Sequence, residues 1–121
     1  MPYHVVVDET TRTIVIKGTG RGTTADTLQL ITEHQQTFRD HIGFNVLYDS
    51  SDLQIDSSPA DMLKVAQALF QDPEIRFGKF AVVVPESRAE LARMFTALAH
   101  PHGVQANVFT HGADALSWLA L

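Results

Sequence analysis

The chain has 121 residues, of which 45% are apolar, and its 9 basic and 14 acidic side chains give a net charge of −5. This length suits one domain with a core of two or three layers, so we expect a single domain over residues 1–121. The negative charge and the lack of clustered Lys and Arg argue against a nucleic-acid partner, and the absence of cysteine excludes disulfides, Cys-ligated metals and thiol nucleophiles.

No membrane segment is expected. The first residues have neither a basic start nor a long apolar run, because Asp8 and Glu9 follow Val5–Val7 directly. The longest apolar run, residues 80–85, is far shorter than the ~20 residues that cross a bilayer. We therefore predict a soluble protein of the cytoplasm.

The N-terminal part predicts a β-hairpin followed by a helix. Tyr3–Val7 and Thr13–Lys17 are rich in β-branched residues and are separated by a polar loop. The glycine-rich segment 18–22 then predicts a break in the chain, after which a helical pattern begins at Thr24 and ends before Gly43. The face of this helix that we expect to be buried contains Leu28, Ile31, Gln35, Phe38 and Ile42.

The middle of the chain predicts a strand, a polar loop and a second helix. Phe44–Tyr48 is expected to form the strand, which ends at Asp49, and residues 50–57 are expected to form the loop. Ser58 at the N-cap, proline at the first helical position and Asp61 three residues after the cap predict a helix over 59–70. Its expected buried face contains Met62, Leu63, Ala66, Leu69 and Phe70.

The C-terminal part continues the alternation of strands and helices. The nearly continuous apolar run Gly78–Val84 predicts a strand that is buried on both faces. Ser87–Glu90 has the pattern of a capping box and predicts a helix that stops at Pro101. Val104–Phe109 predicts a fifth strand, and Ala113–Leu119 a last short helix. The expected inward face of the helix before Pro101 contains Leu91, Met94, Phe95, Leu98 and Ala99.

The order ββαβαβαβα predicts an α/β domain with a mostly parallel five-stranded sheet flanked by helices. Ligands of such sheets lie outside the carboxyl ends of the strands, so we expect any site at that edge. The glycine-rich segment 18–22 could cradle a phosphate there, but no Lys-Ser or Lys-Thr follows it, and a simple turn explains the glycines equally.

Chemistry-bearing motifs are not evident elsewhere. The six histidines show no metal-binding spacing, so no metal site and no cofactor are predicted. Carboxylates at Asp49, Asp52, Asp56 and Asp61 crowd one segment, where they could bind a cation or serve a hydrolase, or simply cap turns in solvent. Because no nucleophile and base pair at a recognisable spacing, we predict that the protein is not an enzyme.

Several segments resemble the STAS domain family of sulfate transporters and anti-sigma factor antagonists. Ile16-Lys17-Gly18 resembles the family's entry from strand to helix, and Ile55-Asp56-Ser57-Ser58 is similar to its phosphorylation loop, although Pro59 stands where the family has glycine. The resemblance implies that a kinase phosphorylates Ser57 or Ser58 and thereby prevents docking on an anti-sigma factor, with Asp56 as the adjacent orienting acid. The N-cap alone also explains Ser58.

Two functions follow from these patterns. The first is a regulatory module that binds a protein partner, such as an anti-sigma factor or a kinase-like regulator. The loop that contacts the partner contains Asp49, Asp52 and Asp56. A homodimer is an alternative state of this module. The second is a carrier of a small apolar, lipid-like ligand, since the C-terminal half resembles an SpoIIAA-like branch that is related in fold to CRAL-TRIO domains. Residues proposed to line its pocket are Met62, Phe70, Phe77, Met94, Phe95 and Trp118.

Overall fold

The computed structural model describes residues 2–121, and these contain one five-stranded sheet. In chain order its strands are β1 (Tyr3–Asp8), β2 (Thr13–Gly22), β3 (Asn45–Ile55), β4 (Lys79–Val83) and β5 (Gln105–Phe109). The helices are α1 (Thr24–Glu33), α2 (Gln35–Asp40), α3 (Pro59–Phe70), α4 (Ala89–Ala99) and α5 (Gly112–Leu119). Short 3-10 turns lie at η1 (Glu86–Arg88) and η2 (His100–His102).

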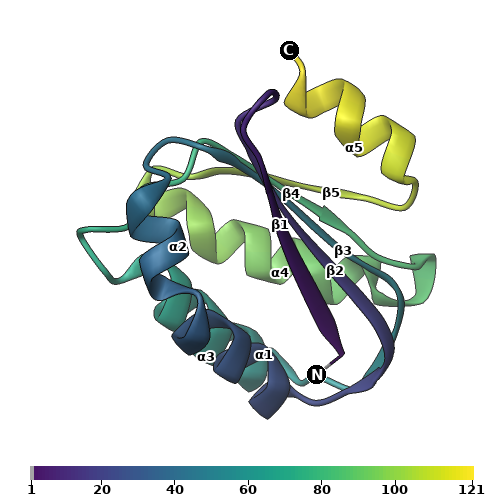
Figure 1. The fold of residues 1–121 in the computed structure, drawn as a ribbon. Coiled ribbons are helices and arrows are strands. Elements are labelled where there is room, and N and C mark those ends of the chain that lie inside the picture. Colours follow the sequence, from purple (N-terminus) through teal and green to yellow (C-terminus); the bar gives the residue numbers. More distant parts are fainter. Residues whose placement is uncertain (1) are drawn as a thin grey trace.

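The strands lie side by side in chain order, with β1 antiparallel to β2 and the other neighbouring pairs parallel. Helices α1 to α4 cover one face of the sheet, and α5 lies on the opposite face (Figure 1). The predicted α/β class and mostly parallel sheet are therefore confirmed. The carboxyl ends of β2 to β5 meet at one edge, which is the edge where the sequence predicts a site.

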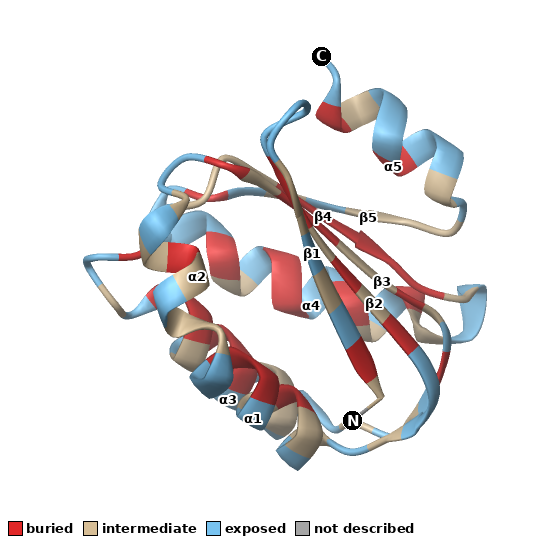
Figure 2. Ribbon diagram, in the orientation of Figure 1, coloured by how far each residue is buried: buried red, intermediate tan, exposed pale blue. Residues whose placement is uncertain are grey.

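The two faces of the sheet bury cores of different size (Figure 2). The larger core lies between the sheet and helices α1 to α4, and its most deeply buried side chains include Ile14, Leu30, Phe38, Val46 and Phe80. The smaller core lies under α5 and contains Leu47, Ala81, Val83, Ala115 and Leu119. Strand β4 contributes to both cores, which explains its nearly continuous apolar sequence.

The prediction that glycines end the second strand is wrong, because β2 continues through all of them to Gly22. A Cβ atom on Gly18 would lie 3.0 Å from the side chains of Leu53 and Tyr3. The absence of a side chain at Gly18 therefore lets Leu53 and Tyr3 lie close over the strand. Gly20 adopts a positive φ of 76°. Since this segment pairs with β3 as far as Ile55, it is part of the sheet and not a phosphate-cradling loop.

The predicted polar loop over 50–57 is also mostly wrong, because β3 extends from Asn45 to Ile55. The extended β2 supplies a pairing partner for these polar residues, and Ser50 is buried at 1% exposure. Only residues 56–58 connect β3 to α3. Asp49 and Asp52 therefore lie on a strand, and only Asp56 of the three predicted acids lies in the loop.

Three helix details differ from prediction. The expected first helix is divided at His34, whose Nδ1 donates to the backbone oxygen of Leu30 over 2.9 Å, and Ile42 lies beyond α2 at 45% exposure. Leu63 and Met94 are also exposed, and nearby buried positions are occupied by Val65 on α3 and Ala92 on α4. Leu63 and Met94 therefore lie on the solvent side of α3 and α4.

The N-terminal caps of α3 and α4 have opposite outcomes. Ser58 caps α3 as predicted, and its capping box with Asp61 is complete. The capping box predicted at Ser87 does not form: η1 precedes α4, and Arg88 occupies the N-cap position without a side-chain hydrogen bond to the helix. The guanidinium of Arg88 instead reaches the end of β3.

Candidate functional site

The predicted site residues gather at the carboxyl edge of the sheet but have different partners. Lys17 on β2 lies between two of them, with Nζ 3.0 Å from Asp49 Oδ2 and 2.9 Å from Asp52 Oδ2. The hydrogen bonds to Asp52 and Asp49 raise the pKa of Lys17 above its usual value. Sequence analysis missed Lys17 because its role depends on the register that places it beside Asp49.

Asp49 is held by further hydrogen bonds. Its Oδ1 accepts the backbone N–H of Ser51 over 3.0 Å and the Ser51 hydroxyl over 2.6 Å. Burial raises the pKa of Asp49, but the hydrogen bonds from Ser51 and the ion pair with Lys17 outweigh it, so this pKa lies below its ordinary value. The Asp49 carboxylate thus belongs to the local structure of β3, whereas Asp52 and Asp56 are exposed.

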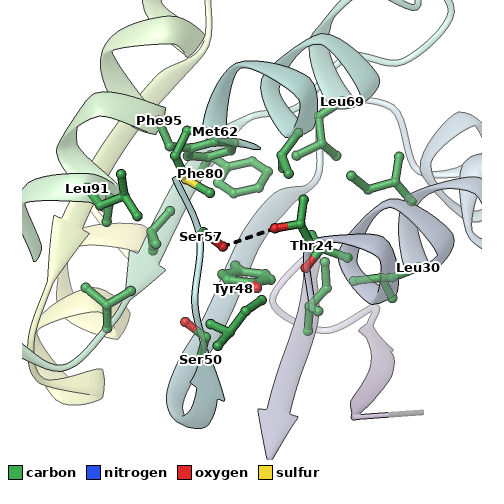
Figure 3. A pocket seen from close by; sticks show the side chains of 18 of the residues that line it. Thr24, Leu30, Tyr48, Ser50, Ser57, Met62, Leu69, Phe80, Leu91 and Phe95 are labelled. Carbon is green, nitrogen blue, oxygen red and sulfur yellow. Dashed lines mark hydrogen bonds between the residues drawn. The ribbon is translucent and has the colours of Figure 1, made fainter. Parts of the chain in front are cut away.

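The two candidate phosphoacceptors, Ser57 and Ser58, differ in environment. Ser58 is exposed, and its Oγ accepts the backbone N–H of Asp61 over 3.1 Å. The backbone N–H of Ser58 donates in turn to Asp61, which lowers the pKa of that carboxyl. Ser57 is half-buried, with its Oγ 3.3 Å from the Thr24 hydroxyl at the start of α1 (Figure 3).

Beside Ser57 lies a cavity of about 90 Å³ between the sheet and helices α1, α3 and α4. Figure 3 shows its largely apolar lining, which includes Leu30, Met62, Leu69, Phe80, Leu91 and Phe95. Of the pocket residues predicted from the sequence, Met62 and Phe95 line this cavity, and Phe70, Phe77, Met94 and Trp118 do not. Trp118 packs on Phe109 across the other face of the sheet, and Met94 is 42% exposed.

A chain of hydroxyl groups borders the cavity. The hydroxyls of Tyr48 and Tyr3 lie 2.6 Å apart, and that of Tyr3 lies 2.8 Å from Thr27 Oγ1. Burial, together with the neighbouring Tyr3, raises the pKa of the Tyr48 phenol well above its usual range. Tyr48 therefore stays a neutral hydrogen-bonding group at neutral pH.

Arg88 stands between this cavity and a polar groove at the surface. It lines both, as do Ile55, Ser57 and Leu91. Its Nη2 donates to the backbone oxygens of Ser50 and, over 2.9 Å, of Leu53. The groove also contains Asp52 and Asp56. The carboxyl edge thus combines a small apolar cavity, a fixed guanidinium and an exposed acidic rim.

Metal and membrane features are few in the described part of the chain. Among residues 2–121, no three His, Cys, Asp or Glu side chains lie close enough together to hold a metal ion. His100 Nε2 instead lies 3.3 Å from the backbone oxygen of Ala106. No helix within that range has the length and apolar character needed to cross a membrane.

Comparisons with solved structures identify the fold. One similar structure is an uncharacterised protein of the DUF3478 family with a SpoIIAA-like fold from Shewanella loihica, 18% identical, covering 97% of this chain and 91% of its own, with a TM-score of 0.63. Another is an anti-sigma factor antagonist from Mycobacterium paratuberculosis, 16% identical, covering 97% of this chain and 93% of its own, with a TM-score of 0.60. No family model and no curated protein matches the sequence.

The protein is therefore an α/β domain, and its particular fold is the SpoIIAA-like fold. This confirms the fold that the STAS resemblance implies. At these identities the likeness concerns the fold alone, so the function has to be argued from the residues at the carboxyl edge.

Proposed function

We propose that this protein is a non-enzymatic regulatory module that binds a protein partner of the anti-sigma factor or kinase-like type. The observation that carries the proposal is the exposed Asp56 and Ser58 at the start of α3, on a fold shared with an anti-sigma factor antagonist. The partner surface comprises this loop, the exposed Asp52 and the solvent side of α3. Asp49 contributes indirectly, because it forms an ion pair with Lys17 and accepts a hydrogen bond from the Ser51 hydroxyl.

The solvent side of α3 has the composition of a contact surface. Leu63 is 46% exposed, and it is flanked by the exposed Lys64 and Gln67 and by Ala60. An exposed apolar side chain with a polar surround supplies buried area on binding, while the surrounding charges set orientation and partner choice. Binding here requires no reacting group.

Phosphorylation of Ser57 or Ser58 is the proposed switch. A phosphate adds about −1.5 to −2 charge at pH 7, next to a rim that already holds Asp52 and Asp56. At the N-terminus of α3 the phosphate is itself stabilised by the helix dipole. The added charge therefore changes partner affinity without unfolding the domain.

Phosphopeptide mass spectrometry of the protein from its native host tests the switch. Trypsin cleavage after Arg39 and Lys64 places both serines in peptide 40–64. We expect phosphate on Ser57 or Ser58 under at least one growth condition. An unmodified peptide under all conditions contradicts the switch.

Affinity capture tests the surface. We expect Asp52→Asn, Ser57→Asp and Ser58→Asp to change the amount of a captured partner at least fivefold. Asp114→Asn, an exposed acid on α5 at the opposite face, is the matched charge control and is expected to change nothing. Retention of every partner by all three variants places the surface elsewhere. A homodimer stays a prediction, which light scattering coupled to gel filtration checks.

A second candidate function is favoured by the cavity. An apolar space of about 90 Å³ with a polar entrance is suited to holding a small apolar ligand, and Met62 in its wall can adapt to different shapes. Organic extraction of the purified protein followed by mass spectrometry is expected to release a stoichiometric small molecule. An empty extract counts against this candidate and leaves the partner surface unaffected.

A further inference from the structure

The guanidinium of Arg88 has unused hydrogen-bonding capacity at the entrance of the cavity. An Arg side chain carries five N–H donors. Three hydrogen bonds are formed here, to the Ser50 backbone oxygen, the Leu53 backbone oxygen and, over 3.4 Å, the Ser50 hydroxyl. These bonds fix the position of the guanidinium, and two donors remain for a ligand.

The charge of Arg88 is also not neutralised within the protein. Among residues 2–121, the ion pairs formed by carboxylates use Lys17, Arg39 and His41, and Arg88 takes part in none. In the groove beside Arg88, the carboxylate of Asp52 is paired with Lys17 and that of Asp56 is exposed. A half-buried cation without a carboxylate partner favours an anionic group placed on it.

The cavity sets the shape of the remainder of such a ligand. An engineered cavity of about 150 Å³ holds the six carbons of benzene, so a cavity of about 90 Å³ has room for about three or four carbons. A single alkyl chain of about six carbons therefore has its terminal three or four carbons in the cavity and the remaining ones in the entrance, toward Arg88. Two-chain lipids are too large.

We propose that the cavity and Arg88 together form a site for a short single-chain carboxylate, with the alkyl chain in the cavity and the carboxylate on the Arg88 guanidinium. This inference rests on the second candidate function and names its ligand class. Apolar burial supplies most of the affinity, and the charge-assisted hydrogen bonds supply selectivity for the anion.

A pair of matched probes separates the two contributions. Hexanoate and hexan-1-ol have the same chain length, and only hexanoate carries the charge. In NMR titrations of the intact protein at pH 7, we expect hexanoate to bind at least tenfold more tightly, with the largest shifts at cavity residues such as Leu69 and Val82. Arg88→Gln is expected to reduce hexanoate binding to the level of hexanol and to leave hexanol binding unchanged.

A cavity-filling variant tests the place of the chain. Ala92 is buried and lines the cavity from α4, so Ala92→Leu is expected to weaken both probes at least tenfold. Ala97→Leu makes the same change at an exposed position of the same helix and is expected to alter neither. Asp56→Asn removes a like charge from the groove and is expected to tighten hexanoate binding about twofold, an effect that salt reduces.

Each contrary result has its own meaning. Equal affinity for the two probes overturns the role of Arg88 and leaves the apolar carrier standing, a comparison that needs no variant to fold. Hexanoate binding that survives Ala92→Leu puts the anion at the surface and overturns the proposed site. Absence of binding by both probes overturns the carrier and this inference together.

Discussion

Ser58 is the N-cap of α3 and also a proposed phosphoacceptor. Measurements of stability distinguish its capping role from the effect of added charge. Ser58→Ala removes the oxygen that accepts the Asp61 N–H over 3.1 Å. Loss of an N-cap side chain typically costs about 1 kcal/mol. We therefore expect Ser58→Ala to lower the free energy of unfolding by about 1 kcal/mol. Asp is as good an N-cap as Ser, so Ser58→Asp is expected to lie within about 0.5 kcal/mol of the parent protein.

Ser57→Ala is the adjacent control. It removes a long hydrogen bond, 3.3 Å from the Thr24 hydroxyl, and leaves the cap of α3 intact. The expected cost is about 0.5 kcal/mol or less, since the remaining contacts of Ser57 are unchanged. The order of stability is therefore parent and Ser58→Asp, then Ser57→Ala, then Ser58→Ala.

Urea unfolding followed by circular dichroism measures these differences. With a slope of about 2 kcal/mol/M, a loss of about 1 kcal/mol moves the midpoint by about 0.5 M. A larger loss for Ser57→Ala than for Ser58→Ala, or a loss for Ser58→Asp equal to that of Ser58→Ala, would refute the capping argument. If the order holds, Ser58→Asp is a charge variant whose effect on partner binding has no stability component.

Three further predictions concern the sheet. Gly18→Ala places a Cβ atom 3.0 Å from side chains of β1 and β3 and is expected to cost about 1–3 kcal/mol by urea unfolding, whereas Gly112→Ala, in open space, is expected to cost nothing. Tyr48→Phe removes the 2.6 Å contact with the Tyr3 hydroxyl and is expected to cost about 1 kcal/mol in the same assay, and an unchanged midpoint would mean that this contact contributes nothing. Asp49→Asn is expected to cost about 0.5–1 kcal/mol at pH 7 through Lys17 and Ser51. Because the pKa of Asp49 lies below its ordinary value of 3.8, this difference is present above pH 3.8 and disappears as the pH falls through the lowered pKa, and a difference that grows on acidification contradicts the argument.

Local patterns in the sequence were sufficient for most of the fold. The apolar run of β4 has no polar face because both faces are covered, and the Ser58–Asp61 spacing fixes the start of α3. The apolar run and the Ser58–Asp61 spacing are both patterns of neighbouring residues, so the sequence alone reveals them. The continuation of β2 through its glycines depends on Tyr3 and Leu53, which are distant in sequence, so local propensity predicted a break there.

The candidate site was less predictable because its key contacts join distant segments. Lys17 meets Asp49 only after β2 and β3 pair in one register. Arg88 reaches the Leu53 backbone oxygen over 35 positions of sequence, while its immediate surroundings suggested nothing more than a helix start. Topology alone predicted the carboxyl edge of the sheet for the candidate site, and the contacts of the side chains at that edge required the tertiary structure.

Ser57 is relevant to both candidate functions, because it lines both the cavity and the groove. Its contact with the Thr24 hydroxyl joins two residues of the cavity wall, one at the start of α1 and one just before α3 (Figure 3). A phosphate on Ser57 cannot stay in that contact without desolvation of its charge, so it has to turn toward solvent and the groove. Under the proposed function, phosphorylation at Ser57 would therefore affect both the partner surface and the cavity, whereas phosphorylation at Ser58 would affect the surface alone. Hexanoate binding by the Ser57→Asp and Ser58→Asp variants distinguishes the two phosphorylation sites. We expect hexanoate affinity to change only in Ser57→Asp. Equal changes in both variants would disprove the separate orientations of the two hydroxyls.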